Sequence, residues 1–193
     1  ETQGKLYTTF QCTRKHFYYL VPYFEIINNA IKMIRITNSD LEQLSIIAKQ
    51  SERKRMNKNY HPKLNDTLQR LLNAMEPGTY VQPHKHEEPD KREIFIILKG
   101  SALVVEFDND GEITEHMLLS AEVGNFVVEI QPCVYHTVIS LEPGTVVYEV
   151  KDGPYNPLDD KNFAKWAPKE GDSDCQRYNS SIIQKTLNQL SAN

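Results

Sequence analysis

Pro77-Gly78-Thr79-Tyr80-Val81-Gln82-Pro83-His84-Lys85-His86 is the most informative stretch of this 193-residue chain. Successive side chains of an extended strand alternate between its two faces, so His84 and His86 project from the same face. Glu93 follows after a polar turn, at the head of the apolar run 94–98, where a neighbouring strand would bring its carboxylate beside the two imidazoles. The stretch therefore predicts three metal ligands close together in the sequence.

His136 is the fourth candidate ligand. It lies in another strand-like run, 134–139, and we expect closure of a sheet on itself to bring it to the other three. Three imidazoles and one carboxylate suit a single divalent transition metal such as Fe, Mn, Ni, Co or Zn, and the residue types do not choose among these ions. A His-x-His pair taken alone is more often an ordinary surface pair.

The spacing of these residues resembles the two conserved motifs of the cupin superfamily. The first motif is matched by Gly78, five residues, His84-x-His86, then Glu93, six residues and Gly100, and the second by Gly124, Pro132 and His136. In that family the two motifs supply three histidines and a glutamate to one metal in a small antiparallel barrel. The resemblance therefore implies that His84, His86, Glu93 and His136 are metal ligands. Cys133 stands where the family carries a turn glycine.

Short strands separated by turn signals run from Gln69 to Lys151, which is typical of an antiparallel sandwich or barrel. We predict a mainly β cupin fold, a double-stranded β-helix or jelly-roll barrel, with a short N-terminal helical segment. The predicted organisation is an N-terminal extension (1–32), a helical lead-in and polar lip (33–68), the barrel (69–172) and a C-terminal tail or short helix (173–193).

The N-terminal extension, residues 1–32, carries scattered aromatic side chains without strand or helix periodicity. Met33 is the first methionine of the chain, and we hypothesise that the extension is translated from upstream of the natural start. A targeting segment is the alternative. Its apolar stretch, 17–27, is interrupted by Pro22 and Glu25 and is too short to span a bilayer.

Local signals place one helix and several turns. Ser39 and Glu42 match a capping box, which predicts a helix from about Asp40 to Glu52. The segment 108–111, Asp-Asn-Asp-Gly, predicts a hairpin turn. The sequence Glu-Pro-Gly-Thr occurs at 76–79 and again at 142–145, which predicts two equivalent corners of the barrel.

A narrower resemblance, to the WbuC-type family of cupin-fold metalloproteins, extends from about Met33 to Asp172. Members of that family are associated with bacterial surface polysaccharide and O-antigen gene sets, and their reaction is not established. The resemblance is carried by 51–61, Asp66, 69–74, 77–81, 83–86, Phe107-Asp108-x-x-Gly111, Glu149-Val150-Lys151-x-Gly153-Pro154-Tyr155 and Trp166-Ala167-Pro168-x-Glu170-Gly171-Asp172.

Composition excludes some classes of partner. The formal net charge is −4 and no long basic run exists, so we expect no nucleic-acid binding, and we expect no membrane association. Cys12, Cys133 and Cys175 are odd in number and lack a CxxC pattern, which argues against a disulfide framework and favours a reducing, cytoplasmic location. Because jelly-roll cupins commonly pair, we expect a homodimer.

The leading functional hypothesis is a metal-dependent enzyme acting on a small sugar-like metabolite, with isomerase-type chemistry ahead of dioxygenation. The alternatives are a non-catalytic carbohydrate-binding or sensing module and a metal-free sugar epimerase, which would not need four metal-type ligands. The side chains predicted to orient the substrate are Asn57, Asn59, His61 and Asn73, with Arg55, Arg70 or Lys91 meeting an anionic group. A solvated helix end is the structural alternative for the charges at 53–58. The catalytic base is unknown, with His61 and Glu149 as candidates.

Overall fold

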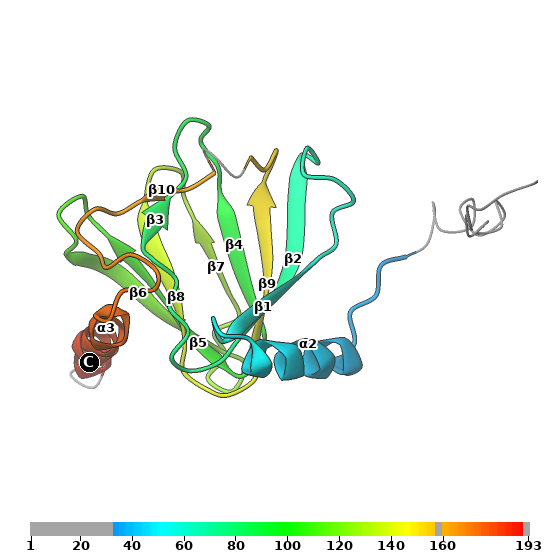
Figure 1. Ribbon diagram of the computed structural model, residues 1–193, viewed down its shortest axis with the longest axis horizontal. Helices are drawn as coiled ribbons and strands as arrows, with labels where there is room; N and C mark the ends of the chain where they lie inside the picture. The colour runs from blue at the N-terminus through cyan, green and yellow to red at the C-terminus, as the bar shows by residue number, and fades with distance from the viewer. Residues whose placement is uncertain (1–32, 157–159, 191–193) are drawn as a thin grey trace, which may run out of the picture. The chain divides into compact units, whose positions relative to one another are not determined.

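The computed structural model describes residues 33–156 and 160–190 (Figure 1). The chain divides between Arg35 and Ile36, and the fold below is that of the unit beginning at Ile36. The hypothesis about residues 1–32 concerns a segment that lies outside the described residues. Neither of the two described helices combines the length and apolarity needed to cross a bilayer.

Two antiparallel sheets of five strands make up most of this unit (Figure 1). The first sheet has the order β1 (Arg55–Asn59), β2 (Leu68–Met75), β9 (Thr145–Asp152), β4 (Glu93–Lys99) and β7 (Val127–Ile130). The second has the order β10 (Asn162–Phe163), β3 (His84–Lys85), β8 (Tyr135–Ser140), β5 (Ser101–Phe107) and β6 (Ile113–Ser120). The predicted mainly β fold with an N-terminal helical segment is confirmed.

The described strands form the two facing sheets of a jelly roll and not a closed barrel. Each sheet ends at unpaired edges, β1 and β7 in one and β10 and β6 in the other, and no strand ladder among the described residues joins the two sheets. Side chains join them instead. Phe95 and Ile97 of the first sheet pack with Val104 and Val138 of the second in one buried cluster. The sheets are therefore layers of a sandwich held by apolar burial.

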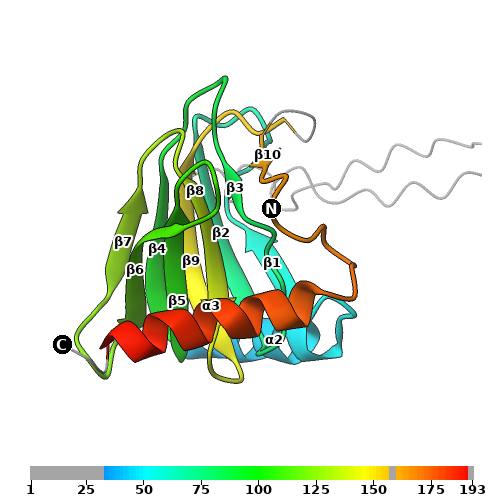
Figure 2. The ribbon, with the colours of Figure 1, turned by 90° about the vertical axis from the view of Figure 1, so that its left-hand side faces the viewer.

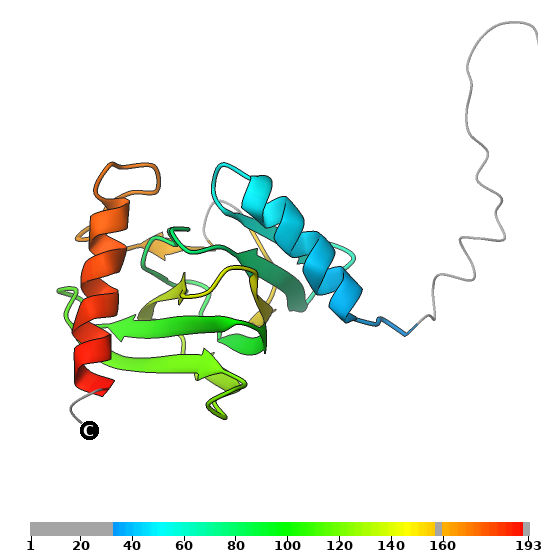
Figure 3. The same ribbon diagram turned by 90° about the horizontal axis from the view of Figure 1, so that it is seen from below.

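A helix covers the outer face of each sheet (Figures 2 and 3). The helix α2 (Asn38–Gln50) buries Leu41 and Leu44 against Leu72 and Val146 of the first sheet. On the second sheet, α3 (Cys175–Leu190) buries Ile182 against the outward-facing residues of β5 and β8, which are Leu103, Val105, Phe107 and Ile139. Alternate residues of β5 point to opposite faces of the sheet. The outward ones pack against α3, while the inward ones form part of the core between the sheets.

The cap of α2 differs from the predicted one. The backbone N–H and the hydroxyl of Thr37 donate to Asp40 Oδ2 at 3.0 and 2.7 Å, so the capping box is Thr37 with Asp40 and not Ser39 with Glu42. Both pairs fit the same four-residue pattern. Burial selects the earlier one, because Ile36 before the cap and Leu41 after it then pack together as a hydrophobic staple.

The predicted turns are present. Residues 108–111 join β5 to β6, and Gly111 has a φ of 92°. The two Glu-Pro-Gly-Thr corners lie in contact with each other, because Glu76 Oε1 accepts the backbone N–H of Gly144 at 3.0 Å. In both corners the glycine has a positive φ, 84° at Gly78 and 71° at Gly144, as a type II turn requires.

Candidate metal centre

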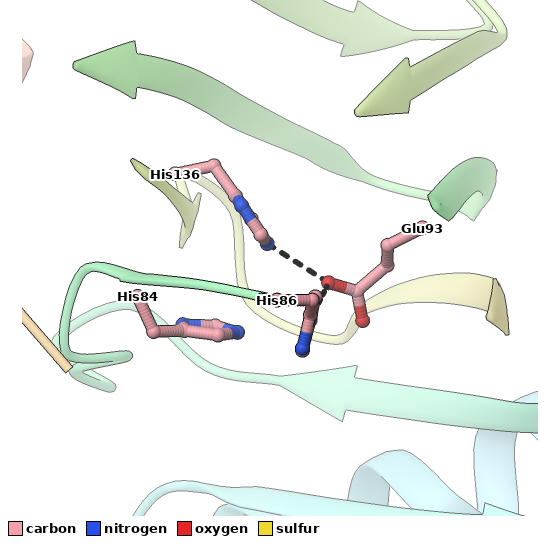
Figure 4. Close-up of side chains that lie close together, drawn as sticks. All are labelled: His84, His86, Glu93 and His136. Carbon is pink, nitrogen blue, oxygen red and sulfur yellow. Dashed lines mark hydrogen bonds and ion pairs between the residues drawn. The ribbon is translucent and has the colours of Figure 1, made fainter. Parts of the chain in front are cut away.

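Four side chains from the two sheets meet at one point (Figure 4). His84 in β3 and His136 in β8 are direct cross-strand partners, and His86 follows β3 immediately. Glu93, the first residue of β4, reaches them from the facing sheet. One ligand atom from each of the four lies within 4.8 Å of the others, and all four residues are buried.

The fold brings His136 to the other candidate ligands in a different way from the predicted one. Its pairing with His84 within one sheet places the two imidazoles side by side, with ring centroids 4.6 Å apart. Closure of a sheet on itself is therefore not needed. Face-to-face packing of the two sheets supplies the remaining ligand, Glu93.

Each imidazole is held by a backbone carbonyl on its Nδ1 side. The distances are 3.0 Å from His84 Nδ1 to the Gln82 oxygen and 2.9 Å from His136 Nδ1 to the Val134 oxygen. His86 Nδ1 contacts the backbone oxygen of Asp160 in the same way. A carbonyl oxygen can only accept, so Nδ1 carries a proton in each ring, and in the neutral form of each imidazole Nε2 is the atom that presents a lone pair.

These Nε2 atoms point at the carboxylate of Glu93. Its Oε2 lies 2.8 Å from His136 Nε2 and 3.1 Å from His86 Nε2, while the buried His84 Nε2 has no hydrogen-bond partner among the described residues. Burial lowers the pKa of His84 well below its ordinary value, so that imidazole is neutral. In their neutral forms the three Nε2 atoms offer lone pairs to a cation beside the carboxylate of Glu93. The donor set, the tautomers and the orphaned His84 Nε2 thus fit one divalent transition ion.

A cavity of about 710 Å³ opens beside these ligands, and His84, Glu93 and His136 are part of its wall. Five of the predicted substrate-binding residues line it as well: Arg55, Asn57, Asn59, His61 and Asn73. The strand register explains their shared position, since Asn57 of β1 is the direct cross-strand partner of Asn73 of β2.

The other two predicted substrate residues, Arg70 and Lys91, are not in the cavity wall. Arg70 lies between Gln69 and Leu71, which do line the cavity, so strand alternation turns it to the opposite face, where it pairs with Asp66 at 3.6 Å. The Lys91 ammonium is buried and lies 2.6 Å from an oxygen of Asp160. The ammonium is held by that carboxylate behind the cavity wall, so this placement does not support the predicted role in meeting an anionic substrate.

Asp160 is a residue that the sequence reasoning missed. Its buried carboxylate lies between two buried ammonium groups, 2.6 Å from Lys91 Nζ and 2.5 Å from Lys151 Nζ. Its backbone oxygen is the carbonyl that holds His86 Nδ1. Asp160 thus orients one candidate metal ligand, His86, and is itself held by two ion pairs. No periodicity or motif surrounds it in the sequence that could have identified it.

Glu149 and Lys161 add two titratable groups to the cavity wall. Burial, together with the negative charge of Glu93, raises the pKa of Glu149 to about 8. The Asn73 side-chain nitrogen donates to Glu149 Oε2 at 3.4 Å. Glu149 and His61, the two candidate bases, therefore share one cavity. Lys161 was not predicted, because it lies in an irregular segment that the tertiary fold brings over the site.

Comparisons with known proteins bear on the fold. Residues 36–119 match a family model described as a domain of unknown function, and a search of curated proteins found no match. Solved structures with a similar fold were found, one of them described as a cupin superfamily protein. They include KdgF from Halomonas sp., with 19% identity over 53% of this chain and 82% of that one and a TM-score of 0.41.

Two further neighbours show the same level of similarity. A cupin superfamily protein from Desulfitobacterium hafniense has 13% identity, covers 51% of this chain and 76% of that one, and has a TM-score of 0.40. The capsular polysaccharide assembling protein CapF from Staphylococcus aureus has 22% identity, covers 55% of this chain and 28% of that one, and has a TM-score of 0.47. The chain thus spans under a third of the length of CapF, and these likenesses concern the fold alone.

Proposed function

We propose that this protein is a metal-dependent cupin enzyme acting on a small sugar-like metabolite, with isomerase-type chemistry favoured over dioxygenation. The observation that carries the proposal is the convergence of three imidazole Nε2 atoms and one carboxylate at the wall of a polar cavity. The residues that would hold the ion are His84, His86, Glu93 and His136. When bound, such an ion supplies Lewis acidity toward a carbonyl or hydroxyl oxygen.

The polar wall supports a substrate with several hydroxyl groups. Asn57, Asn59 and Asn73 offer amide donors and acceptors on one side of the cavity. Amides bind hydroxyls in either hydrogen-bonding direction, so a sugar-like molecule can be oriented without any net charge on this wall.

Placement of the acid–base groups supports isomerisation. Moving a carbonyl along a sugar requires a proton to leave one carbon and return to its neighbour, and a side chain within reach must take and return it. The carboxyl group of Glu149 and the imidazole of His61 both line the cavity that contains the proposed ligands.

The second candidate function is a non-catalytic carbohydrate-binding or sensing module. The amide-lined wall favours it as much as it favours an enzyme, since Asn57, Asn59 and Asn73 suit the retention of a sugar without turnover. A link to surface polysaccharide biosynthesis rests on the sequence resemblance to the WbuC-type family. The homodimer and the cytoplasmic location likewise remain predictions from the sequence.

The first test is the metal content of protein purified without added metal, measured by elemental mass spectrometry. We expect near-stoichiometric metal in the wild type and its loss in the double variant His84→Ala, His136→Ala. His116→Ala is the matched control, because His116 lies in β6, outside the ligand cluster, and that variant should keep its metal. Absence of metal from the wild type, even after reconstitution with each candidate ion, would contradict the proposal.

The second test separates enzyme from binding module. Metal-loaded protein is incubated in deuterated water with a panel of aldoses and ketoses, and exchange of carbon-bound protons is followed by NMR. We expect exchange in the wild type and a loss of about 100-fold or more in Glu149→Gln with unchanged metal content. Sugar binding without exchange or product would favour the non-catalytic module.

A further inference from the structure

Lys161 stands out among the cations of the cavity wall. Arg53 and Arg55 both bind the carboxylate of Glu170, each at 2.7 Å. Lys151 binds Asp160. The side chain of Lys161 is accessible, and its ammonium makes no hydrogen bond or ion pair with any residue in the described part of the chain. Desolvation lowers the pKa of Lys161 while the negative charges of Glu93 and Glu149 raise it, so Lys161 is a cation of the cavity wall without a direct partner among the described residues.

The charged groups in and directly behind the cavity wall have an excess of positive charge once the proposed ion is bound. Lys91 and Lys151 share the single carboxylate of Asp160, which leaves one positive charge. Lys161 adds a second, and a divalent ion held with Glu93 adds a third. An enclosed site with uncompensated charge is costly, so the complementary ligand is an anion.

Ionisation of Glu149 would remove only one of these three charges, so the requirement for an anion does not depend on its protonation state. Nearby, the buried side-chain oxygen of Asn73 has no hydrogen-bond donor among the described residues, although its nitrogen binds Glu149. Leaving a buried amide oxygen unsatisfied costs about 1 to 3 kcal/mol. A hydroxyl group on the ligand would satisfy it.

The type of anion follows from the donors that are present. Phosphate sites use several N–H groups, commonly from a helix N-terminus or from arginine forks. No described residue of the cavity wall belongs to the first turn of a helix, and both arginines already hold Glu170. A single lysine suits a carboxylate. The volume of about 710 Å³ accommodates a monosaccharide-sized molecule.

We propose that the ligand of this cavity is a polyhydroxy carboxylic acid, a sugar acid, with its carboxylate on Lys161 and a hydroxyl on the side-chain oxygen of Asn73. The inference rests on the proposed metal function and narrows its substrate from sugar-like molecules in general to acidic ones. Neutral sugars would leave the charge of Lys161 uncompensated.

The test is calorimetric binding to the metal-loaded full chain, using pairs of ligands that differ in the carboxylate: glucuronate with glucose, galacturonate with galactose, and gluconate with glucitol. We expect at least one acid to bind about tenfold or more tightly than its neutral partner. Lys161→Met should abolish that preference and Lys161→Arg should retain most of it. Lys165→Met is the matched control, because Lys165 is exposed and outside the cavity wall, and it should leave the preference unchanged.

Two outcomes would overturn the inference. One is equal binding within every pair, or a preference that survives in Lys161→Met. The other is tighter binding of glucose 6-phosphate than of any carboxylate. Metal content measured on the same samples distinguishes this failure from a failure of the proposed function. Full metal occupancy without a preference for acids would overturn the sugar acid ligand but not the metal-dependent enzyme. A Lys161-dependent preference in protein that holds no metal would overturn the metal-dependent enzyme but not the sugar acid ligand.

Discussion

Cys133 shows how one residue can be anomalous in sequence and explicable in structure. It occupies the position where the cupin resemblance predicts a turn glycine, and its φ is 65°, in the left-handed region that favours glycine. Its backbone N–H donates to the oxygen of His86 at 3.1 Å, so the turn is attached to a candidate metal ligand. The strain therefore lies beside the metal centre and not within it.

Cys133→Gly should relieve this strain and raise the free energy of unfolding by about 1 kcal/mol, measured by chemical denaturation. The matched control is Cys133→Ala, which removes the exposed thiol but keeps the Cβ atom responsible for the strain. An equal gain in the alanine variant would show that the thiol, and not the backbone conformation, is the cause.

Asp160 allows a sharper prediction, because its removal leaves two buried ammonium groups unpaired. Asp160→Asn should lower the free energy of unfolding by about 3 kcal/mol, in the range for breaking a buried ion pair. It should also weaken metal binding about tenfold or more, because the carbonyl that orients His86 loses its anchor. Denaturation and metal titration measure the two effects.

The comparison for Asp160 is Asp152→Asn, which removes an ion pair with the exposed Arg92 at 2.9 Å. Exposed pairs contribute about 0 to 1 kcal/mol, so this variant should be nearly as stable as the wild type and keep its metal affinity. An equal loss of stability in the two variants would show that the buried ion pairs of Asp160 with Lys91 and Lys151 stabilise the fold no more than an exposed ion pair does.

At the scale of elements, helix α2 shows where local pattern and tertiary packing disagree. Two overlapping four-residue patterns qualify as capping boxes, and the one that forms is the one whose flanking residues, Ile36 and Leu41, reach the sheet. Local hydrogen bonding does not favour one capping box over the other, since both patterns satisfy free N–H groups at the start of the helix. Burial of the staple makes the difference.

Thr37→Ala should therefore destabilise the protein by about 1 kcal/mol, whereas Ser39→Ala should have an effect within about 0.5 kcal/mol, measured by thermal or chemical denaturation. Among the described residues, the Ser39 hydroxyl accepts one hydrogen bond, at 3.3 Å, from the exposed side chain of Gln43. A larger loss of stability in Ser39→Ala than in Thr37→Ala would support the cap predicted from the sequence.

At the scale of the whole molecule, the candidate centre connects the two sheets. Three ligands belong to the second sheet or its immediate continuation, and Glu93 belongs to the first. An ion bound there would bridge two layers that are also joined by apolar side chains and by hydrogen bonds such as the one from the Ser140 hydroxyl to the Met75 carbonyl. Metal binding should consequently stabilise the fold and not only the site.

Removal of the metal by a chelator should lower the melting temperature, with a loss of about 2.7 kcal/mol if the free ion had been present at 100 times its dissociation constant. Scanning calorimetry with and without chelator measures the shift. The control is Glu93→Ala, which lacks the ligand from the first sheet and should respond little to the chelator. The same shift in that variant would indicate that the ion binds elsewhere.

Local sequence determined the parts of this protein that depend on neighbouring residues: the turns at 76–79, 108–111 and 142–145, the helix near residues 38–50, and a His-x-His pair on one strand face. Motif spacing also identified the four candidate ligands, because strand alternation fixes which side chains share a face. These features follow from backbone geometry over a few residues.

Tertiary structure alone decided the rest. The pairing of His84 with His136, the arrival of Glu93 from the facing sheet, and the position of Asp160 and Lys161 depend on contacts between segments far apart in the chain. Arg70 was predicted to bind the substrate, but its side chain lies on the other face of the sheet. Which face it occupies cannot be known before the strand register is known. Burial of side chains between the layers sets the strand register and pairs the buried charges. Neither can be predicted from a local sequence pattern.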